Sequence, residues 1–280
     1  MRIKTASDPP SPLPAPTSPL LRLGKLSVGE LVAGKNEGAS SYPKSTDYFQ
    51  ARGDEHFEQT FAQLYGTQPQ TLRVMFASDD PAFSCEERLE LRDNAGKLYA
   101  YGDGETCWFY KEEEKAYTTV RHLSEHPQVM EKAVEHLRKN LSGRSAAAIG
   151  WKPTLYLRVI LPEFPALGYW QFVTHAEKTT IPNLRNTFDQ CLADFGTVRL
   201  FAFKLMAQKV KSNRPGAVNQ YTIVSMVPLI SMSEGMKLAR YMSENPQATP
   251  QQLYWQGQHL IGPGGADTDY QPLQGEQTAT

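Results

Sequence analysis

Few residues in this sequence could carry chemistry, and the closest approach to a catalytic motif is HLSEH at positions 122–126. His122 and His126 with Glu125 fit the H-x-x-E-H pattern of zinc-dependent hydrolases. On a helix the two imidazoles would share a face, as two zinc ligands must. Pro127 follows directly, however, and the residue before a proline is biased away from helical backbone. We therefore favour polar histidines near a helix start over a metal site.

Two other acidic or glycine-rich stretches invite a ligand interpretation. Asp79 and Asp80 follow the apolar stretch Thr71–Ala77 and could bind a divalent cation at a strand end. Asp-Asp-Pro more often ends a strand and caps the next turn, and the glycines at 102–104 are typical of a tight turn. The chain has no glycine-flanked serine elbow and no phosphate-binding loop. The sequence thus predicts no catalytic residue, no metal ligand and no cofactor.

Cations offer the one plausible contact region. Six of them lie on or near a single predicted hairpin: Lys178, Arg185, Lys204, Lys209, Lys211 and Arg214. Cations on a projecting hairpin can meet phosphates, although lysines also serve simply to keep exposed strands soluble. We take these six as candidate contacts for nucleic acid or for a protein partner.

The elements that must position these residues are short in the first half. Asp54 can cap a helix over Glu55–Tyr65 that Gly66 ends. A strand follows at Thr71–Ala77. The expected hairpins pair Cys85–Arg92 with Lys97–Tyr101 and Thr106–Tyr110 with Ala116–Val120, and a helix is expected over Pro127–Leu141.

The second half repeats the logic in the order strand, strand, helix, strand, strand. Thr154–Leu161 and Tyr169–His175 are expected to pair as a hairpin, and a helix runs from Thr180 to a stop at Gly196. Two long strands then span Arg199–Lys211 and Val218–Leu229, followed by a helix at Glu234–Tyr241.

These elements predict an α+β fold of mainly antiparallel sheets with a few packed helices, in two similar-sized halves. The small residues of GRSAAAIG (143–150) favour a boundary, so the halves would span 21–142 and 151–245. Residues 1–20 are rich in proline and serine and predict a disordered tail. Residues 262–280 predict a flexible polar tail.

Composition narrows the class of protein. A formal net charge of -1 with dispersed Lys and Arg argues against a strongly basic nucleic-acid module. Three scattered cysteines fit a reducing cytosol better than a disulfide scaffold. No apolar run is long enough to span a bilayer. We therefore expect a cytoplasmic protein without a membrane partner.

Two blocks of the sequence resemble a phage family. The first runs LRLGKL, YPKSTDYF, YGTQPQTLRVMFASDD and GKLYAYGDG; the second runs LYLRVILPEFPALGYWQFVTHAEKTTIPNLRNTF, FGTVRLFAFKLMAQK and YTIVSMVPL. Their order and spacing are similar to those of recombination directionality factor-like proteins, which are encoded beside large serine integrases in phages and integrative elements.

The resemblance implies a non-catalytic protein that binds a serine integrase on DNA and favours excision over integration, in the cytoplasm of the bacterial host. DNA would be met, if at all, through the integrase complex. Many family members carry a cysteine cluster between the two blocks, whereas residues 124–145 here contain no cysteine. No metal ligand is therefore carried over. Two alternatives stay open: a phage nucleic-acid-binding protein of replication or recombination, and a metal-dependent hydrolase using the 122–126 motif with Asp79 or Asp80.

Overall fold

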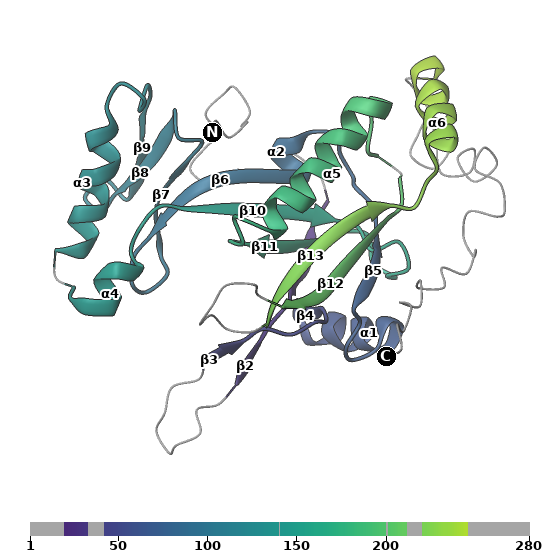
Figure 1. Ribbon diagram of the computed structural model, residues 1–280, viewed down its shortest axis with the longest axis horizontal. Coiled ribbons are helices and arrows are strands. Elements are labelled where there is room, and N and C mark those ends of the chain that lie inside the picture. Colours follow the sequence, from purple (N-terminus) through teal and green to yellow (C-terminus); the bar gives the residue numbers. More distant parts are fainter. Residues whose placement is uncertain (1–19, 33–41, 140, 200, 212–219, 246–280) are drawn as a thin grey trace, which may run out of the picture.

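A computed structural model describes residues 20–32, 42–139, 141–199, 201–211 and 220–245 (Figure 1). Its largest feature is an eight-stranded sheet. The strands in spatial order are β4 (Gln50–Gly53), β1 (Arg22–Ser27), β11 (Tyr169–Thr174), β10 (Lys152–Val159), β6 (Cys85–Arg92), β7 (Leu98–Gly102), β8 (Cys107–Lys111) and β9 (Ala116–Val120). Every neighbouring pair is antiparallel except β1 and β11, which run parallel.

Two smaller sheets complete the strands. One has three antiparallel strands in the order β13 (Gln220–Pro228), β12 (Phe203–Lys211) and β5 (Thr71–Val74). The other pairs β2 (Glu30–Val32) with β3 (Tyr42–Lys44). The expected α+β class with mainly antiparallel sheets is confirmed.

Helix ends follow from local chemistry. Helix α1 (Glu55–Tyr65) starts where the Asp54 carboxylate accepts from the His56 amide and ends at Gly66, as the sequence predicts. Gly196 adopts left-handed backbone and ends α5 (Thr180–Phe195). The other helices are α2 (Pro81–Ser84), α3 (Pro127–Arg138), α4 (Gly143–Ala148) and α6 (Met232–Glu244).

The segment expected to be a boundary is mostly helical: residues 143–148 form the short helix α4. Three consecutive alanines, the strongest helix formers, occupy 146–148. The sequence pattern of small residues therefore reflected helix propensity rather than an open connection.

The main core lies between the eight-stranded and three-stranded sheets. Trp170 and Phe172 on β11 and Phe203 on β12 are buried there. Helix α5 adds Phe188, whose ring meets Phe76 edge-on at 5.0 Å between centroids. Because buried side chains of both sheets and of α5 belong to one hydrophobic cluster, these elements form one packed unit.

A second, smaller core lies under α3. Leu91 of β6 and Ala100 of β7 pack there with Ala133 and Ile149. The Trp151 indole donates to the Met130 carbonyl and fixes α3 to the start of β10. Within the described ranges, no helix combines the length and hydropathy needed to cross a membrane.

Both large sheets take strands from each side of the expected boundary at 143–150. Strand β6 pairs with β10, and β5 pairs with β12. The boundary therefore does not separate one sheet from another, and a division into halves stays a prediction. The expected tails at 1–20 and 262–280 lie outside the described residues, apart from Leu20.

Candidate partner-binding surface

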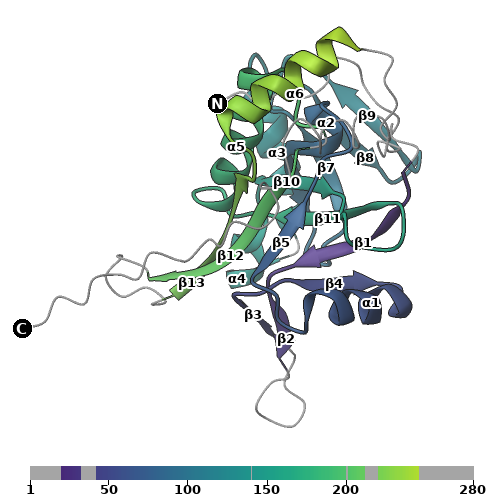
Figure 2. The ribbon, with the colours of Figure 1, turned by 90° about the vertical axis from the view of Figure 1, so that its right-hand side faces the viewer.

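Strands β12 and β13 form a long two-stranded ribbon, which we call the ribbon. They pair along their whole length, from Phe203 opposite Pro228 to Lys211 opposite Gln220. Strand β5 pairs only with Phe203–Met206 of β12. Beyond Met206 the ribbon therefore lacks the third strand, and Figure 2 shows it projecting from the body of the protein.

The inner face of the ribbon, which faces the core, is apolar at the base and cationic farther out. Leu205 and Ala207 are buried, and Lys209 and Lys211 continue the same alternation beyond the core. Lys209 Nζ lies 3.4 Å from a carboxylate oxygen of Asp47. Opposite Lys209 on β13, Thr222 donates to the Thr46 carbonyl at 2.6 Å. These contacts fix the ribbon to the segment before β4.

The free edge of β13 is protected by α5. Thr180 Oγ1 accepts from the Val224 amide at 3.1 Å, and Thr187 Oγ1 donates to the Met226 carbonyl at 3.1 Å. Exposed edge strands invite unwanted pairing with other chains. Thr180 and Thr187, about two turns apart on one face of α5, bond to the Val224 and Met226 part of this edge, which makes that part less available for pairing with another chain.

The outer face of the three-stranded sheet carries the residues that alternate with the buried ones. They are Thr71 and Arg73 on β5; Lys204, Met206, Gln208 and Val210 on β12; and Tyr221, Ile223, Ser225 and Val227 on β13. Tyr221 and Val227 are each 40% exposed. The outer face of the three-stranded sheet thus combines the cations Lys204 and Arg73 with large apolar side chains.

The structure separates the six cations named from the sequence. Lys204 is on the outer face, while Lys209 and Lys211 are on the inner face near the tip. Lys178 is exposed in the turn before α5. Arg214 lies outside the described residues.

Arg185 differs from the other candidate contacts because its side chain is buried. Its side chain is 9% exposed and donates to the Cys85 carbonyl at 2.7 Å and to Asp189 at 2.8 Å. The contact with Cys85 joins α5 to the start of β6, and Asp189, one turn further along α5, holds the guanidinium in place. Arg185 is therefore a structural link, and little of it is open to DNA or to another protein.

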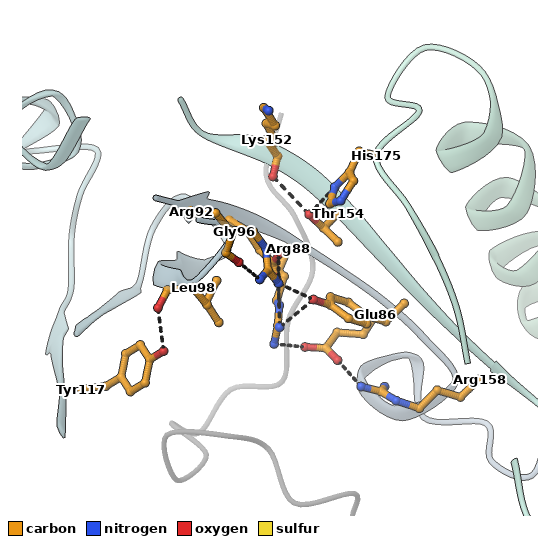
Figure 3. Close-up of polar contacts among 12 residues, drawn as sticks. Glu86, Arg88, Arg92, Gly96, Leu98, Tyr117, Lys152, Thr154, Arg158 and His175 are labelled. Carbon is orange, nitrogen blue, oxygen red and sulfur yellow. Dashed lines mark hydrogen bonds and ion pairs between the residues drawn. The ribbon is translucent and has the colours of Figure 1, made fainter. Parts of the chain in front are cut away.

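A second polar cluster, which the sequence interpretation did not identify, lies on the face of the eight-stranded sheet away from α5 (Figure 3). We call it the arginine–glutamate network: Glu86, Arg88, Glu90 and Arg92 alternate along β6, and Tyr156 and Arg158 lie on β10. Arg88 Nε donates to Glu90 at 2.8 Å, and Arg92 Nε donates to the same carboxylate at 2.9 Å. Arg158 reaches Glu86 at 2.7 Å. The sequence feature that indicates this network is the alternating pattern E-x-R-x-E-x-R at positions 86–92, which places four charged side chains on one face of β6.

The network is internally neutralised. Burial alone would raise the pKa of Glu90, but Arg88, the Tyr156 hydroxyl and Arg92 outweigh it and hold that pKa below its ordinary value. Burial raises the pKa of Tyr101, whose ring lies 4.8 Å from the Arg88 guanidinium, to about 12. Glu90 thus stays a charged acceptor between arginines, and the cluster supports the fold rather than proton transfer.

The acidic residues proposed as metal ligands have other partners. Asp79 Oδ1 accepts from the Thr197 hydroxyl and from the amides of Val198 and Arg199. His122 has left-handed backbone and His126 is the N-cap of α3, so the two do not share a helix face. Over the stretches of chain that the structure describes, no group of three or more His, Cys, Asp and Glu is arranged to hold a metal ion.

One hydroxyl–histidine pair and two cysteines are candidate nucleophiles. Thr154 Oγ1 lies 2.9 Å from His175 Nδ1, which is the pairing of a hydroxyl nucleophile with a base (Figure 3). Thr154 itself is fully buried, although it and His175 border a hollow of about 430 Å³, and no acidic side chain is seen to orient the His175 ring among its described hydrogen bonds. Burial also raises the pKa of the Cys85 and Cys107 thiols to about 12, which keeps them protonated at neutral pH.

Comparison with known proteins gives one result that identifies the chain. Neither a search of curated proteins nor a search of solved structures found a match. A family model, Gp3-like, described as recombination directionality factor-like, matches residues 23–229. That span covers most of the chain and includes both large sheets and the ribbon. The protein therefore belongs to the recombination directionality factor-like family.

Proposed function

We propose that this protein is a non-catalytic directionality factor that binds a serine integrase on DNA and favours excision over integration. The observation that carries the proposal is the family match over residues 23–229. The projecting ribbon supports it, because its outer face carries partly exposed apolar side chains beside Lys204 and the neighbouring Arg73 of β5. The near-neutral net charge suits a protein that acts on another protein rather than on bare DNA.

Such a factor acts by differential binding. It must bind the excision-competent arrangement of the integrase more tightly than the integrative arrangement, since a ligand with equal affinity for both shifts nothing. A preference of about 2.8 kcal/mol would change the ratio of the two outcomes about a hundredfold. Binding, not bond chemistry, supplies this energy. We place this action in the bacterial cytoplasm, where the integrase meets its DNA.

The test is a reconstituted recombination reaction. Purified protein is titrated into the serine integrase encoded by the same element, once with attachment sites that integrate and once with sites that excise. We expect inhibition of the first reaction and stimulation of the second. No effect on either reaction, with integrase that is active alone, would overturn the proposal.

Direct DNA contact by the ribbon is a second candidate function. It is favoured by Lys209 and Lys211 near the tip of a two-stranded ribbon, an element of suitable width for the major groove. The double charge reversal Lys209→Glu with Lys211→Glu should then weaken binding to duplex DNA and flatten its salt dependence. Lys132→Glu, at an exposed site on α3, is the matched control. Equal salt slopes in all three proteins would exclude this function.

A further inference from the structure

The ribbon packs its base on the core through its inner face, and its outer face is also rich in apolar residues, which is unusual for a sheet at the surface. Antiparallel sheets commonly pack one face on the core and leave a polar face to solvent. The inner face here is packed, with Leu205, Val224 and Met226 buried. Yet five of the eight outer positions on β12 and β13 are also apolar: Met206, Val210, Tyr221, Ile223 and Val227. Exposure to solvent would favour polar residues at these positions, so the apolar residues need another explanation.

Exposed apolar side chains concentrate in the same region of the chain. Eight large apolar residues are exposed among those described, and five of them fall between positions 221 and 236. After Tyr221 and Val227 come Leu229, then Met232 and Met236 at the start of α6. Scattered apolar residues need no explanation, but a concentrated group marks an interaction site. The methionines suit such a role, because their flexible side chains adapt to a partner.

A hollow of about 450 Å³ borders this group. It lies between α5 and the junction of β13 with α6, and its apolar lining includes Cys191, Phe195, Pro228, Ile230 and Met232. Met232 is thus shared by the hollow and the exposed group. Most of the lining comes from α5, and Pro228 alternates with the outer-face residues of β13, so the hollow lies on the α5 side of the ribbon and not on its outer face.

The charges beside the apolar residues are positive. Arg73 of β5 lies opposite Lys204 of β12 on the outer face, and the ten residues of that face include no Asp or Glu. Glu163 approaches Arg73 at 3.8 Å, but both side chains are more than 40% exposed, so that pair contributes little. A matching partner therefore carries apolar side chains with acidic side chains along one flank.

Little of the described fold covers this face. The elements that pack most closely on the ribbon are β5, which extends the sheet, and α5, which approaches β13 through Thr180 and Thr187 at its edge. In Figure 2 the three strands lie side by side in front of the main sheet. From Tyr221 to Val227 the face is about 20 Å long, which is the length of about 13 residues of α-helix.

We propose that the outer face of the ribbon docks an amphipathic helix of the integrase that is apolar on one side and acidic along its flank. This inference rests on the proposed function and names the surface through which it acts. Lys204 and Arg73 orient the helix through its acidic flank, and the apolar residues of β12 and β13 provide the buried contact.

The first arm of the test compares matched aspartate substitutions. The full-length double variant Tyr221→Asp with Val227→Asp changes two half-exposed positions, and Leu167→Asp changes a residue that is 80% exposed in the β10–β11 turn. Affinity for the integrase is measured by biolayer interferometry. We expect at least a thirtyfold loss of affinity for the double variant, about the loss of one strong interface residue, and no change for Leu167→Asp. Wild-type affinity in the double variant would overturn the surface, while leaving the proposed function intact.

The second arm uses a substitution that keeps an aromatic ring. A photoreactive phenylalanine analogue replaces Tyr221, and the cross-linked integrase peptide is identified by mass spectrometry. An apolar peptide with acidic residues on one flank supports the proposal, and cross-links confined to DNA or to a second copy of this protein overturn it. If the wild-type protein fails to bind integrase at all, the proposed function fails, and the surface assignment fails with it.

Discussion

Asp79 provides a direct test of whether the acidic residues of this protein are structural or catalytic. One carboxylate oxygen accepts three hydrogen bonds: from the Thr197 hydroxyl at 2.8 Å, the Val198 amide at 2.7 Å and the Arg199 amide at 3.1 Å. Thr197 and Val198 are buried. Asp79 therefore joins the end of the β5 region to the segment between α5 and β12. The substitution Asp79→Ala removes all three acceptor contacts.

The expected cost follows from these partners. A hydrogen bond to a charged group contributes about 1.5–3 kcal/mol, but the three do not add, because the Arg199 amide also has the Thr197 hydroxyl as an acceptor at 3.1 Å. The Val198 amide loses its acceptor in a buried position. We expect Asp79→Ala to cost about 3 kcal/mol and Asp79→Asn, which keeps an acceptor oxygen, about 1 kcal/mol. Asp80, which caps α2 through the Ala82 amide, is the control, and its alanine variant should cost about 1 kcal/mol.

Urea unfolding of the three variants measures these differences. The metal-hydrolase alternative makes a contrary prediction, since a metal at Asp79 would stabilise the wild-type protein and chelation would lower its melting temperature by several degrees. Under the structural interpretation, dialysis against EDTA leaves the wild-type melting temperature unchanged. A loss below about 1 kcal/mol for Asp79→Ala, or a clear effect of EDTA, would refute the reasoning.

Three further predictions concern buried charge and packing. Glu90→Gln leaves two network arginines without their carboxylate and should cost about 3–5 kcal/mol at neutral pH. Burial alone would raise the pKa of Glu90, but the neighbouring arginines outweigh it and lower that pKa. The stability that Glu90 contributes is therefore present above its unfolded pKa of about 4.3 and is lost as pH falls through the folded pKa. Parallel pH profiles of the urea midpoint for wild type and variant would contradict this. Burial raises the pKa of Glu87, so its ionised form opposes folding, and Glu87→Gln should stabilise the protein at pH 7 by less than about 1 kcal/mol, with no gain near pH 3 in thermal melts. Gly235→Ala would place a methyl 2.5 Å from the Phe195 ring and should destabilise α6 by about 1–3 kcal/mol, seen as faster amide exchange in that helix; a higher melting temperature, the usual result of Gly→Ala in a helix, would count against it.

Local chemistry was readable from the sequence. The bounds of α1 were predicted from Asp54 and Gly66, and both act as expected. The end of α5 was predicted from Gly196, which has left-handed backbone. The hairpin between β6 and β7 turns at residues 93–96, where the Asp93 carboxylate accepts from the Ala95 and Lys97 amides. In each case a side chain acts on backbone within a few residues, so no distant segment of the chain is needed.

Long-range pairing was not readable in the same way. The sequence of β5 does not indicate that it pairs with β12, and the sequence of β1 does not indicate that it pairs in parallel with β11. Strand pairing depends on which side chains are buried in the assembled protein. The burial of Arg185 was missed for the same reason, since its acceptor is the carbonyl of Cys85, 100 positions away. The arginine–glutamate network was missed although E-x-R-x-E-x-R is visible, because a charged strand face is usually solvated.

The two blocks that carry the family resemblance depend on each other physically. The first block supplies β5 and β6, and the second supplies β12 and β10, with which they pair. Because β5 pairs with the base of β12 and stops at Met206, it holds the base in the sheet, and the outer end of the ribbon has only its own pair of strands. The contacts of Lys209 and Thr222 with residues 46–47 then restrain where that outer end points. If the ribbon receives the integrase, the first block contributes by fixing its direction, and a substitution of the buried β5 residue Leu72, which does not reach the outer face, should weaken binding through the angle of the ribbon.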